Sequence, residues 1–148
     1  MSLPPLPLSA IVVGADASDW REAVQLAADA LARSGAAEAS YGAEMIRMIE
    51  EHGPYVVIAP GLALAHARPG PEVHADGLSI VTLATPVSFG HPHNDPVRVV
   101  LGLAIATPDA HLAAVAAVAN VFNDSHAIQE LSAATSPEEV QRIMGAGS

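Results

Sequence analysis

The sequence contains no cysteine, which excludes both disulfide bonds and a cysteine nucleophile. Basic residues are also scarce: six of them stand against sixteen acidic residues, giving a formal net charge of −10 at pH 7. Nucleic-acid backbones are bound chiefly by lysine and arginine, so we expect no nucleic-acid partner. The negative charge either favours a protein partner with a basic contact face or serves solubility alone.

Long hydrophobic runs are missing too. The apolar stretch over 97–106, VRVVLGLAIA, is shorter than the roughly 18–20 residues that span a bilayer. The first residues, MSLPPLPLSA, lack the basic flank and cleavage pattern of a signal peptide. We therefore expect a cytoplasmic protein.

The chain has 148 residues, of which 51% are hydrophobic, enough for a packed core rather than disorder. Its proline-rich start predicts an extended N-terminal arm over residues 1–9, which a cloning tag would partly explain. We expect a single domain over residues 10–145.

The apolar patterning predicts alternating strands and helices. Strands are expected over 10–13, 55–60, 61–67, 77–84 and 97–106, and helices over 19–35, 41–53, 107–122, 126–134 and 136–144. The two strands within 55–67 leave no room for a crossover helix, so they form a hairpin. The fold class is therefore α/β, a three-layer sandwich with a mixed sheet of about five strands flanked by helices on both faces.

Three helix starts carry capping signals. Thr107 precedes Pro108 and Asp109, Ser136 forms a capping box with Glu139, and the helix over 126–134 is capped near Asp124 or Ser125. The buried stripe of the helix after Thr107 is expected to comprise Leu112, Val115, Val118, Ala119 and Phe122.

One histidine ends an apolar strand. In GLALAHARPG the period of two places Leu62, Leu64, His66 and Arg68 on one side and the intervening alanines on the other. Ligands of open α/β sheets bind at strand ends, where loops diverge. His66 is therefore either a functional group or a structural histidine.

Two further segments carry polar groups suited to chemistry. His111 lies in the first turn of a capped helix, where the helix dipole disfavours an imidazolium. The segment HPHND over 91–95 includes Asn94 and Asp95, which form either a surface turn or part of a site. Combined with His66 or His111, this segment could also offer ligands to zinc.

Four segments together resemble a known family: GPYVVIAPGLALAHARP, GLSIVTLATPVSFGH, NDPV and HLAAVAAVANVF. They are similar to the enzyme IIA component of the bacterial phosphoenolpyruvate-dependent sugar phosphotransferase system. The resemblance is to the mannitol/fructose-type family, and most closely to its L-ascorbate-specific branch. It runs from about Trp20 to Met144 and implies a mixed sheet flanked by helices.

The resemblance implies a phosphoryl carrier. His66 matches the phosphorylated histidine, and His111 matches a second histidine close to it in space. The phosphoryl group would come from the phosphocarrier HPr and pass to an enzyme IIB, while the membrane enzyme IIC carries out translocation. Direct transfer of this kind needs no cofactor and no metal. Neutral imidazole, with an ordinary pKa near 6.5, both attacks and leaves readily.

Further roles are assigned as expectations. Arg68 either contacts the phosphate or pairs with Glu72 or Asp76, and Asn94 or Asp95 orients an imidazole by accepting its other ring proton. Ala65 departs from the family pattern, which has proline directly before the active histidine. Proline would restrict the local backbone, so its loss affects geometry and removes no chemical group.

Three alternatives stay open. The chain is a transport component, a regulatory enzyme IIA-like domain that signals to protein partners, or a ligand-binding domain that has lost transfer. Apolar helix faces leave room for a homodimer. The sugar follows from the resemblance alone, since an enzyme IIA contacts proteins and never the sugar.

Overall fold

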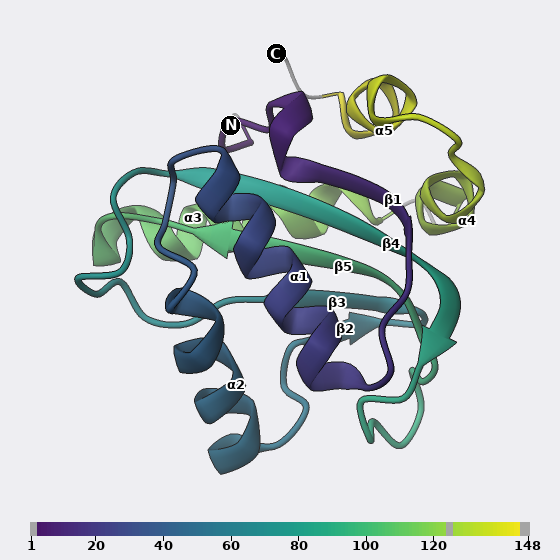
Figure 1. Ribbon diagram of the computed structural model, residues 1–148, viewed down its shortest axis with the longest axis horizontal. Coiled ribbons are helices and arrows are strands. Elements are labelled where there is room, and N and C mark those ends of the chain that lie inside the picture. The colour runs from purple at the N-terminus through teal and green to yellow at the C-terminus, as the bar shows by residue number, and fades with distance from the viewer. Residues whose placement is uncertain (1–2, 124–125, 146–148) are drawn as a thin grey trace.

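A computed structural model describes residues 3–123 and 126–145. Its centre is a mixed five-stranded sheet (Figure 1). In spatial order the strands are β1 (Ile11–Ala15), β4 (Gly77–Val87), β5 (Val97–Ala104), β3 (Leu62–Ala65) and β2 (Val57–Ala59). The pairs β1–β4 and β3–β5 are parallel, whereas β4–β5 and β2–β3 are antiparallel. The predicted hairpin within 55–67 is confirmed.

Helices cover both faces of the sheet, which confirms the predicted three-layer α/β sandwich (Figure 1). On one face lie α1 (Trp20–Arg33) and α2 (Tyr41–His52). On the other lie α3 (Pro108–Val121), α4 (His126–Ala133) and α5 (Pro137–Met144). A short 3₁₀ helix, η1 (Leu8–Ala10), precedes β1.

The alternation along β3 divides the core as the sequence predicts. Leu62 and Leu64 pack into the cluster beneath α3, α4 and α5, while Ala63 and Ala65 pack into the cluster beneath α1 and α2. All four side chains are fully buried. The strand ends directly before His66, so the packing that fixes β3 also fixes the start of the site.

Small residues let α1 approach the sheet closely. Ser79 Oγ on β4 donates a hydrogen bond to the carbonyl oxygen of Ala27 on α1, at 2.8 Å. Beside it on β5, a Cβ atom at Gly102 would collide with Ser79 Oγ and lie 3.2 Å from the Ala27 oxygen. Gly102 is therefore required by the spacing between helix and sheet. It is also the β5 partner of Ala65, the last residue of β3.

The start of α3 matches its capping signal, and the predicted buried stripe is confirmed in part, because Val115, Val118 and Phe122 pack in the cluster on this face of the sheet. The Thr107 side chain accepts a hydrogen bond from the Ala110 N–H, with Pro108 in the first turn. Leu112, expected in the buried stripe, is 77% exposed. The stripe that packs on the sheet is centred on Ala114 and Val118, and at about 100° per residue Leu112 lies roughly 120° from Val118 around the axis.

The N-terminal arm packs on the domain. From residue 3 to residue 7 it is without regular structure, but residues 8–10 are helical, which corrects the prediction of an extended arm to residue 9. Leu6 is fully buried in the α3–α5 cluster. The Leu78 N–H donates to the Pro5 oxygen, and Gln141 Nε2 donates to the Leu6 oxygen. These contacts join the arm to β4 and α5.

The remaining caps are as follows. Ser136 Oγ accepts a hydrogen bond from the Glu139 N–H, as predicted, while Glu139 Oε1 accepts one from the Thr135 N–H. The proposed caps Asp124 and Ser125 lie outside the described residues. Within residues 3–123 and 126–145, no helix combines the length and the hydropathy needed to cross a membrane.

We predict that Gly102→Ala lowers the free energy of unfolding by about 1–3 kcal/mol, because the new methyl group overpacks the contact between α1 and the sheet. Urea denaturation measures the change. As a control, Gln129→Ala on the exposed surface of α4 should change stability by less than about 0.5 kcal/mol. Equal stability of Gly102→Ala and wild type would show that α1 does not approach β5 this closely.

Candidate active site

His66 lies directly after β3, partly buried, with its ring folded back on its own strand. His66 Nδ1 lies 2.7 Å from the carbonyl oxygen of Leu64. A carbonyl oxygen only accepts hydrogen bonds, so Nδ1 carries the proton in this contact. In the neutral ring Nε2 then bears the free lone pair. Nε2 is therefore the nucleophilic atom of His66.

His111, in the first turn of α3, lies beside His66. The two ring centroids are 5.4 Å apart and the rings are inclined by 47°. His111 Nδ1 is buried and has no hydrogen-bond partner among the residues that the structure describes. Burying an N–H group without a partner costs more free energy than burying an unpaired nitrogen lone pair. The burial of Nδ1 therefore favours, for the neutral ring, the tautomer with the proton on Nε2. The structure thus brings His66 and His111 together from two elements, as the family resemblance implies.

The surroundings of His66 keep its imidazole neutral. Burial is the largest influence and lowers the pKa of His66 below its usual value, and the neighbouring His111 lowers it further. The hydrogen bond to Leu64 acts in the opposite direction without reversing the shift. Nε2 therefore keeps its lone pair to lower pH than a free imidazole would.

Two tyrosines that the sequence did not assign to the site contact this segment. Tyr55 Oη donates to the His66 carbonyl oxygen at 2.8 Å, and its ring meets the His66 ring edge-on with centroids 5.4 Å apart. Tyr41 Oη accepts a hydrogen bond from the Ala67 N–H at 3.0 Å. Tyr41 belongs to the buried face of α2. The available signal was that a buried tyrosine hydroxyl usually finds a polar partner.

Arg68 is exposed and makes no ion pair or hydrogen bond with other described residues. Its predicted alternative partners do not engage it; Asp76 instead accepts a hydrogen bond from the Ala106 N–H. The surface ion pair with Glu72 or Asp76 is therefore not formed. The guanidinium, two residues after His66, remains available to an anion.

Asn94 and Asp95 do not orient an imidazole of the site, which corrects the prediction. The Asn94 carbonyl accepts a hydrogen bond from Gly61 N–H, which places both residues at the start of β3. His66 follows the other end of that strand, roughly 15 Å away at about 3.3 Å per residue. The Leu64 carbonyl occupies the orienting position instead.

Asp95 closes its own loop. Its carboxylate accepts hydrogen bonds from Ser88 Oγ and from the backbone N–H groups of Phe89, Gly90 and His91. These bonds lower the pKa of Asp95 despite the opposing effect of its burial. His91 Nδ1 in turn accepts from the N–H groups of His93 and Asn94. The side chains of His91 and Asp95 in HPHND thus form hydrogen bonds within their own loop. Among the described residues, no group of three or more metal-ligating side chains lies close together.

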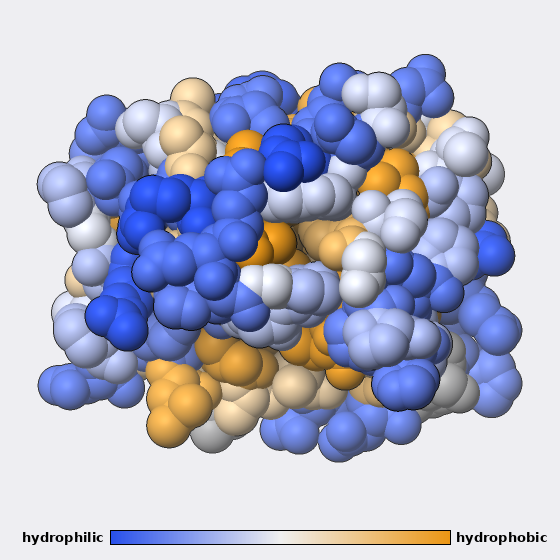
Figure 2. Space-filling view, turned by 90° about the horizontal axis from the view of Figure 1, so that it is seen from below, coloured by the Kyte–Doolittle hydropathy of each residue, from blue (hydrophilic) through white to orange (hydrophobic). Residues whose placement is uncertain are grey.

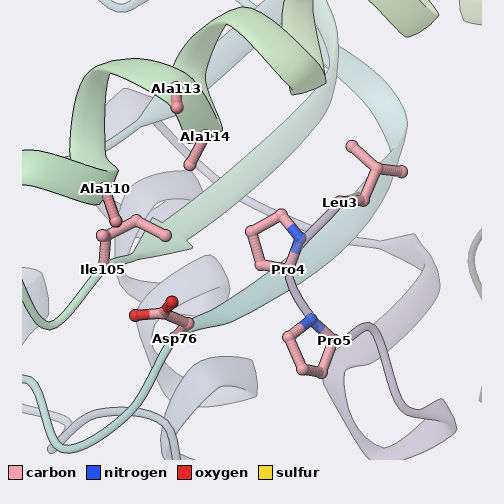
Figure 3. A pocket seen from close by; sticks show the side chains of 8 residues that line it. All are labelled: Leu3, Pro4, Pro5, Asp76, Ile105, Ala110, Ala113 and Ala114. Carbon is pink, nitrogen blue, oxygen red and sulfur yellow. The ribbon is translucent and has the colours of Figure 1, made fainter. Parts of the chain in front are cut away.

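Two hollows of the surface lie apart from the histidine pair. One, of about 310 Å³, lies between the N-terminal arm and α3, and its lining is apolar apart from Asp76 (Figure 3). The other, of about 350 Å³, lies by Gly61 and Asn94 at the start of β3. Figure 2 shows the molecule from the side of the β2 edge of the sheet. Hydrophilic residues gather there over α2, and beside them the surface is hollowed and apolar at its floor. Neither the 310 Å³ nor the 350 Å³ hollow is lined by His66 or His111.

Comparison with known proteins shows the family to which this chain belongs. The family model described as "Phosphoenolpyruvate-dependent sugar phosphotransferase system, EIIA 2" matches residues 5–146. The ascorbate-specific PTS system EIIA component of Escherichia coli (strain K12) is 36% identical over 127 residues, which are 85% of this chain and 82% of that protein. The resemblance predicted from the sequence is confirmed.

Solved structures share the fold. The mannitol-specific cryptic phosphotransferase enzyme IIA CmtB of Escherichia coli is 28% identical, with a TM-score of 0.83 over 96% of each chain. The enzyme IIA of mannitol, in a complex with phosphorylated enzyme IIB from Escherichia coli, has a TM-score of 0.81 at 23% identity over 95% of this chain and 98% of that one. The second likeness shows the fold alone.

We predict that His66 titrates below the ordinary imidazole pKa of about 6.5 and, when neutral, carries its proton on Nδ1. Nitrogen chemical shifts of the ring, followed by NMR against pH, measure both properties. Because the unfolded chain binds this proton more tightly, the His66 contribution makes stability rise with pH between the folded pKa and about 6.5. A neutral ring with the proton on Nε2 would contradict the assignment of the nucleophilic atom.

Proposed function

We propose, because this chain belongs to the EIIA 2 family of the phosphoenolpyruvate-dependent sugar phosphotransferase system, that His66 is the residue on which it carries the phosphoryl group. Members of the family are phosphotransferase components with a phosphohistidine intermediate. The observation that supports His66 is its geometry: Nδ1 is engaged by Leu64, Nε2 is free, and a second histidine stands beside it. The carrier nitrogen is then His66 Nε2.

The transfer exchanges one P–N bond for another. The lone pair of His66 Nε2 attacks the phosphorus of a phosphohistidine on HPr, the P–N bond of the donor breaks, and its electron pair returns to the donor nitrogen. Nδ1 keeps its proton throughout, and the Leu64 carbonyl stabilises the positive charge that the ring gains. Transfer to enzyme IIB repeats the step in the opposite sense, with His66 as leaving group. The hydrogen bond to Leu64 serves both directions.

His111 and Arg68 supply the charge stabilisation. Phosphoryl transfer proceeds through a loose transition state whose charge is spread over the equatorial oxygens, so catalysis is largely positioning and electrostatics. The Nε2–H of His111 donates to one of those oxygens, and the free guanidinium of Arg68 contacts another. The first turn of α3, with Thr107 as its cap, holds His111 in place.

The partners are small proteins rather than a bound substrate. HPr is the donor and an enzyme IIB the acceptor, working in the cytoplasm beside a membrane enzyme IIC. The Escherichia coli mannitol enzyme IIA, which shares this fold, has been solved with phosphorylated enzyme IIB. The transported sugar is L-ascorbate, as in the ascorbate-specific relatives. The net charge of −10 suits partners with basic contact faces.

We predict that the protein, incubated with phosphoenolpyruvate, enzyme I and HPr, gains one acid-labile phosphoryl group, and that His66→Ala gains none. Intact-mass measurement detects the group, and acid treatment should remove it. His91→Ala, in a loop at the other end of β3, should be phosphorylated like wild type. Phosphorylation of His66→Ala at the wild-type rate would eliminate the assignment.

We further predict that His111→Gln is still phosphorylated but passes the group to enzyme IIB on the order of 100-fold more slowly, because a donor to the transition state is lost. Arg68→Gln should slow transfer about tenfold through loss of a charge-assisted hydrogen bond. Arg98→Gln is the matched control, since it removes an exposed arginine on β5 without affecting the site. Rapid-quench assays measure the rates. Equal slowing by Arg98→Gln would show that Arg68 acts only through the net charge of the protein and does not contact the phosphoryl group.

The transport role has its own test. Expression of the gene should restore phosphotransferase-dependent ascorbate uptake to a strain that lacks its ascorbate enzyme IIA, whereas His66→Ala should not. Phosphorylation in the reconstituted system without transfer to an ascorbate enzyme IIB or restored uptake would favour the regulatory alternative.

A further inference from the structure

The peptide group between His66 and Ala67 is held at both polar atoms by tyrosine hydroxyls. Tyr55 Oη donates to its carbonyl oxygen at 2.8 Å, and Tyr41 Oη accepts from its N–H at 3.0 Å. Strand β3 ends at Ala65, so this peptide lies beyond the strand's regular pairing. Side chains from elsewhere in the sequence thus replace the partners that a strand would provide.

Tyr41 is the buried one of these two tyrosines. It is 1% exposed, and its hydroxyl donates to the carbonyl oxygen of Leu103 on β5 at 2.9 Å while accepting from Ala67. Burial raises the pKa of Tyr41 to about 12, so the hydroxyl keeps its proton. One hydroxyl therefore joins the segment after His66 to the centre of the sheet.

Tyr55, unlike Tyr41, lies outside the core. It is 38% exposed and lies in the turn between α2 and β2. The turn is itself held: Tyr55 N–H donates to the Gly53 oxygen, and the carbonyl of Val56 accepts from the Leu64 N–H. Tyr55 is therefore placed by the same strand, β3, whose last residue precedes His66.

The ring of Tyr55 also restricts the ring of His66. The Tyr55 and His66 rings meet edge-on at 88°, and the His111 ring also contacts the His66 ring, at a centroid distance of 5.4 Å. With the following peptide fixed and one side of the ring occupied, the imidazole is held in the orientation that directs Nδ1 to the Leu64 oxygen. At position 65 an alanine provides less backbone restraint than a proline would.

We propose that Tyr55 is a positioning residue for phosphoryl transfer: its hydroxyl and ring edge, together with Tyr41, hold His66 so that Nδ1 donates to Leu64 and Nε2 faces the incoming phosphoryl group. The inference rests on the proposed function of His66. Tyr55 contacts the backbone and ring of the nucleophile and takes no part in bond making.

The experiment compares Tyr55→Phe with wild type by two readouts. NMR nitrogen shifts of the unphosphorylated protein give the fraction of neutral His66 with its proton on Nδ1, and a rapid-quench assay with phosphorylated HPr gives the rate of acceptance. We expect that fraction to fall measurably and the rate to drop about fivefold, the factor corresponding to one net hydrogen bond. The thermal midpoint should change little, because the ring remains and the position is partly exposed.

Two further variants sharpen the test. Tyr55→Leu removes the ring edge as well and should lower both readouts further than Tyr55→Phe. Ser18, which precedes α1, carries another exposed hydroxyl, and that hydroxyl donates a hydrogen bond to the Glu22 carboxylate. Ser18→Ala should change neither readout. A slower rate with an unchanged proton position would overturn the positioning role, as would a changed proton position with an unchanged rate.

The inference and the proposed function fail in different ways. If wild type accepts no phosphoryl group on His66, the proposed function fails. The tautomer measurement needs no phosphoryl donor, so it still tests whether Tyr55 orients the ring. If wild type is phosphorylated on His66 and Tyr55→Phe matches it in both readouts, only the role of Tyr55 is overturned.

Discussion

One hydrogen bond, from His66 Nδ1 to the carbonyl oxygen of Leu64, determines what the site can do. An imidazole in solution exchanges its proton between two nitrogens, and only the nitrogen without it is a nucleophile. The carbonyl lies two residues back along the chain and cannot donate, so a neutral ring that bonds to it carries its proton on Nδ1. The remaining features of the site either keep this bond in place or act on the nitrogen that it leaves free.

The sheet keeps the bond in place. Leu64 is buried in the pairing of β3 with its neighbours, and Gly102 and Ser79 let α1 pack closely on β5 and β4 beside that strand. The acceptor is therefore part of the rigid centre of the molecule, while the donor ring lies at its edge. Such an arrangement combines a fixed proton with a reachable nucleophile.

The sequence predicted the fold and the two histidines better than it predicted their surroundings. Periodicity assigns β3 and its two faces, and capping signals assign the start of α3, because both depend on neighbours in the chain. Asn94 and Asp95 were misplaced because nothing local reveals to which end of β3 a loop returns. Leu112 was misplaced because the mostly apolar, alanine-rich α3 offers two possible stripes, and packing chooses between them. Tyr55 was missed because the sequence predicts the β2–β3 hairpin but not that the Tyr55 hydroxyl contacts the His66 carbonyl across it.

The exposure of the site fits transfer between proteins. Leu112, next in sequence to His111, is 77% exposed, and Tyr55 beside His66 is 38% exposed. An apolar side chain gains nothing from solvent but contributes when a partner covers it. A small phosphorylated metabolite would need an enclosing pocket to exclude water, whereas a carrier protein covers the nitrogen with its own surface. A neutral His66 beside His111, with the exposed Arg68 two residues further along the chain, is therefore consistent with an intermediate carrier. Such a carrier binds the phosphoryl group on a nitrogen that a partner protein can still reach.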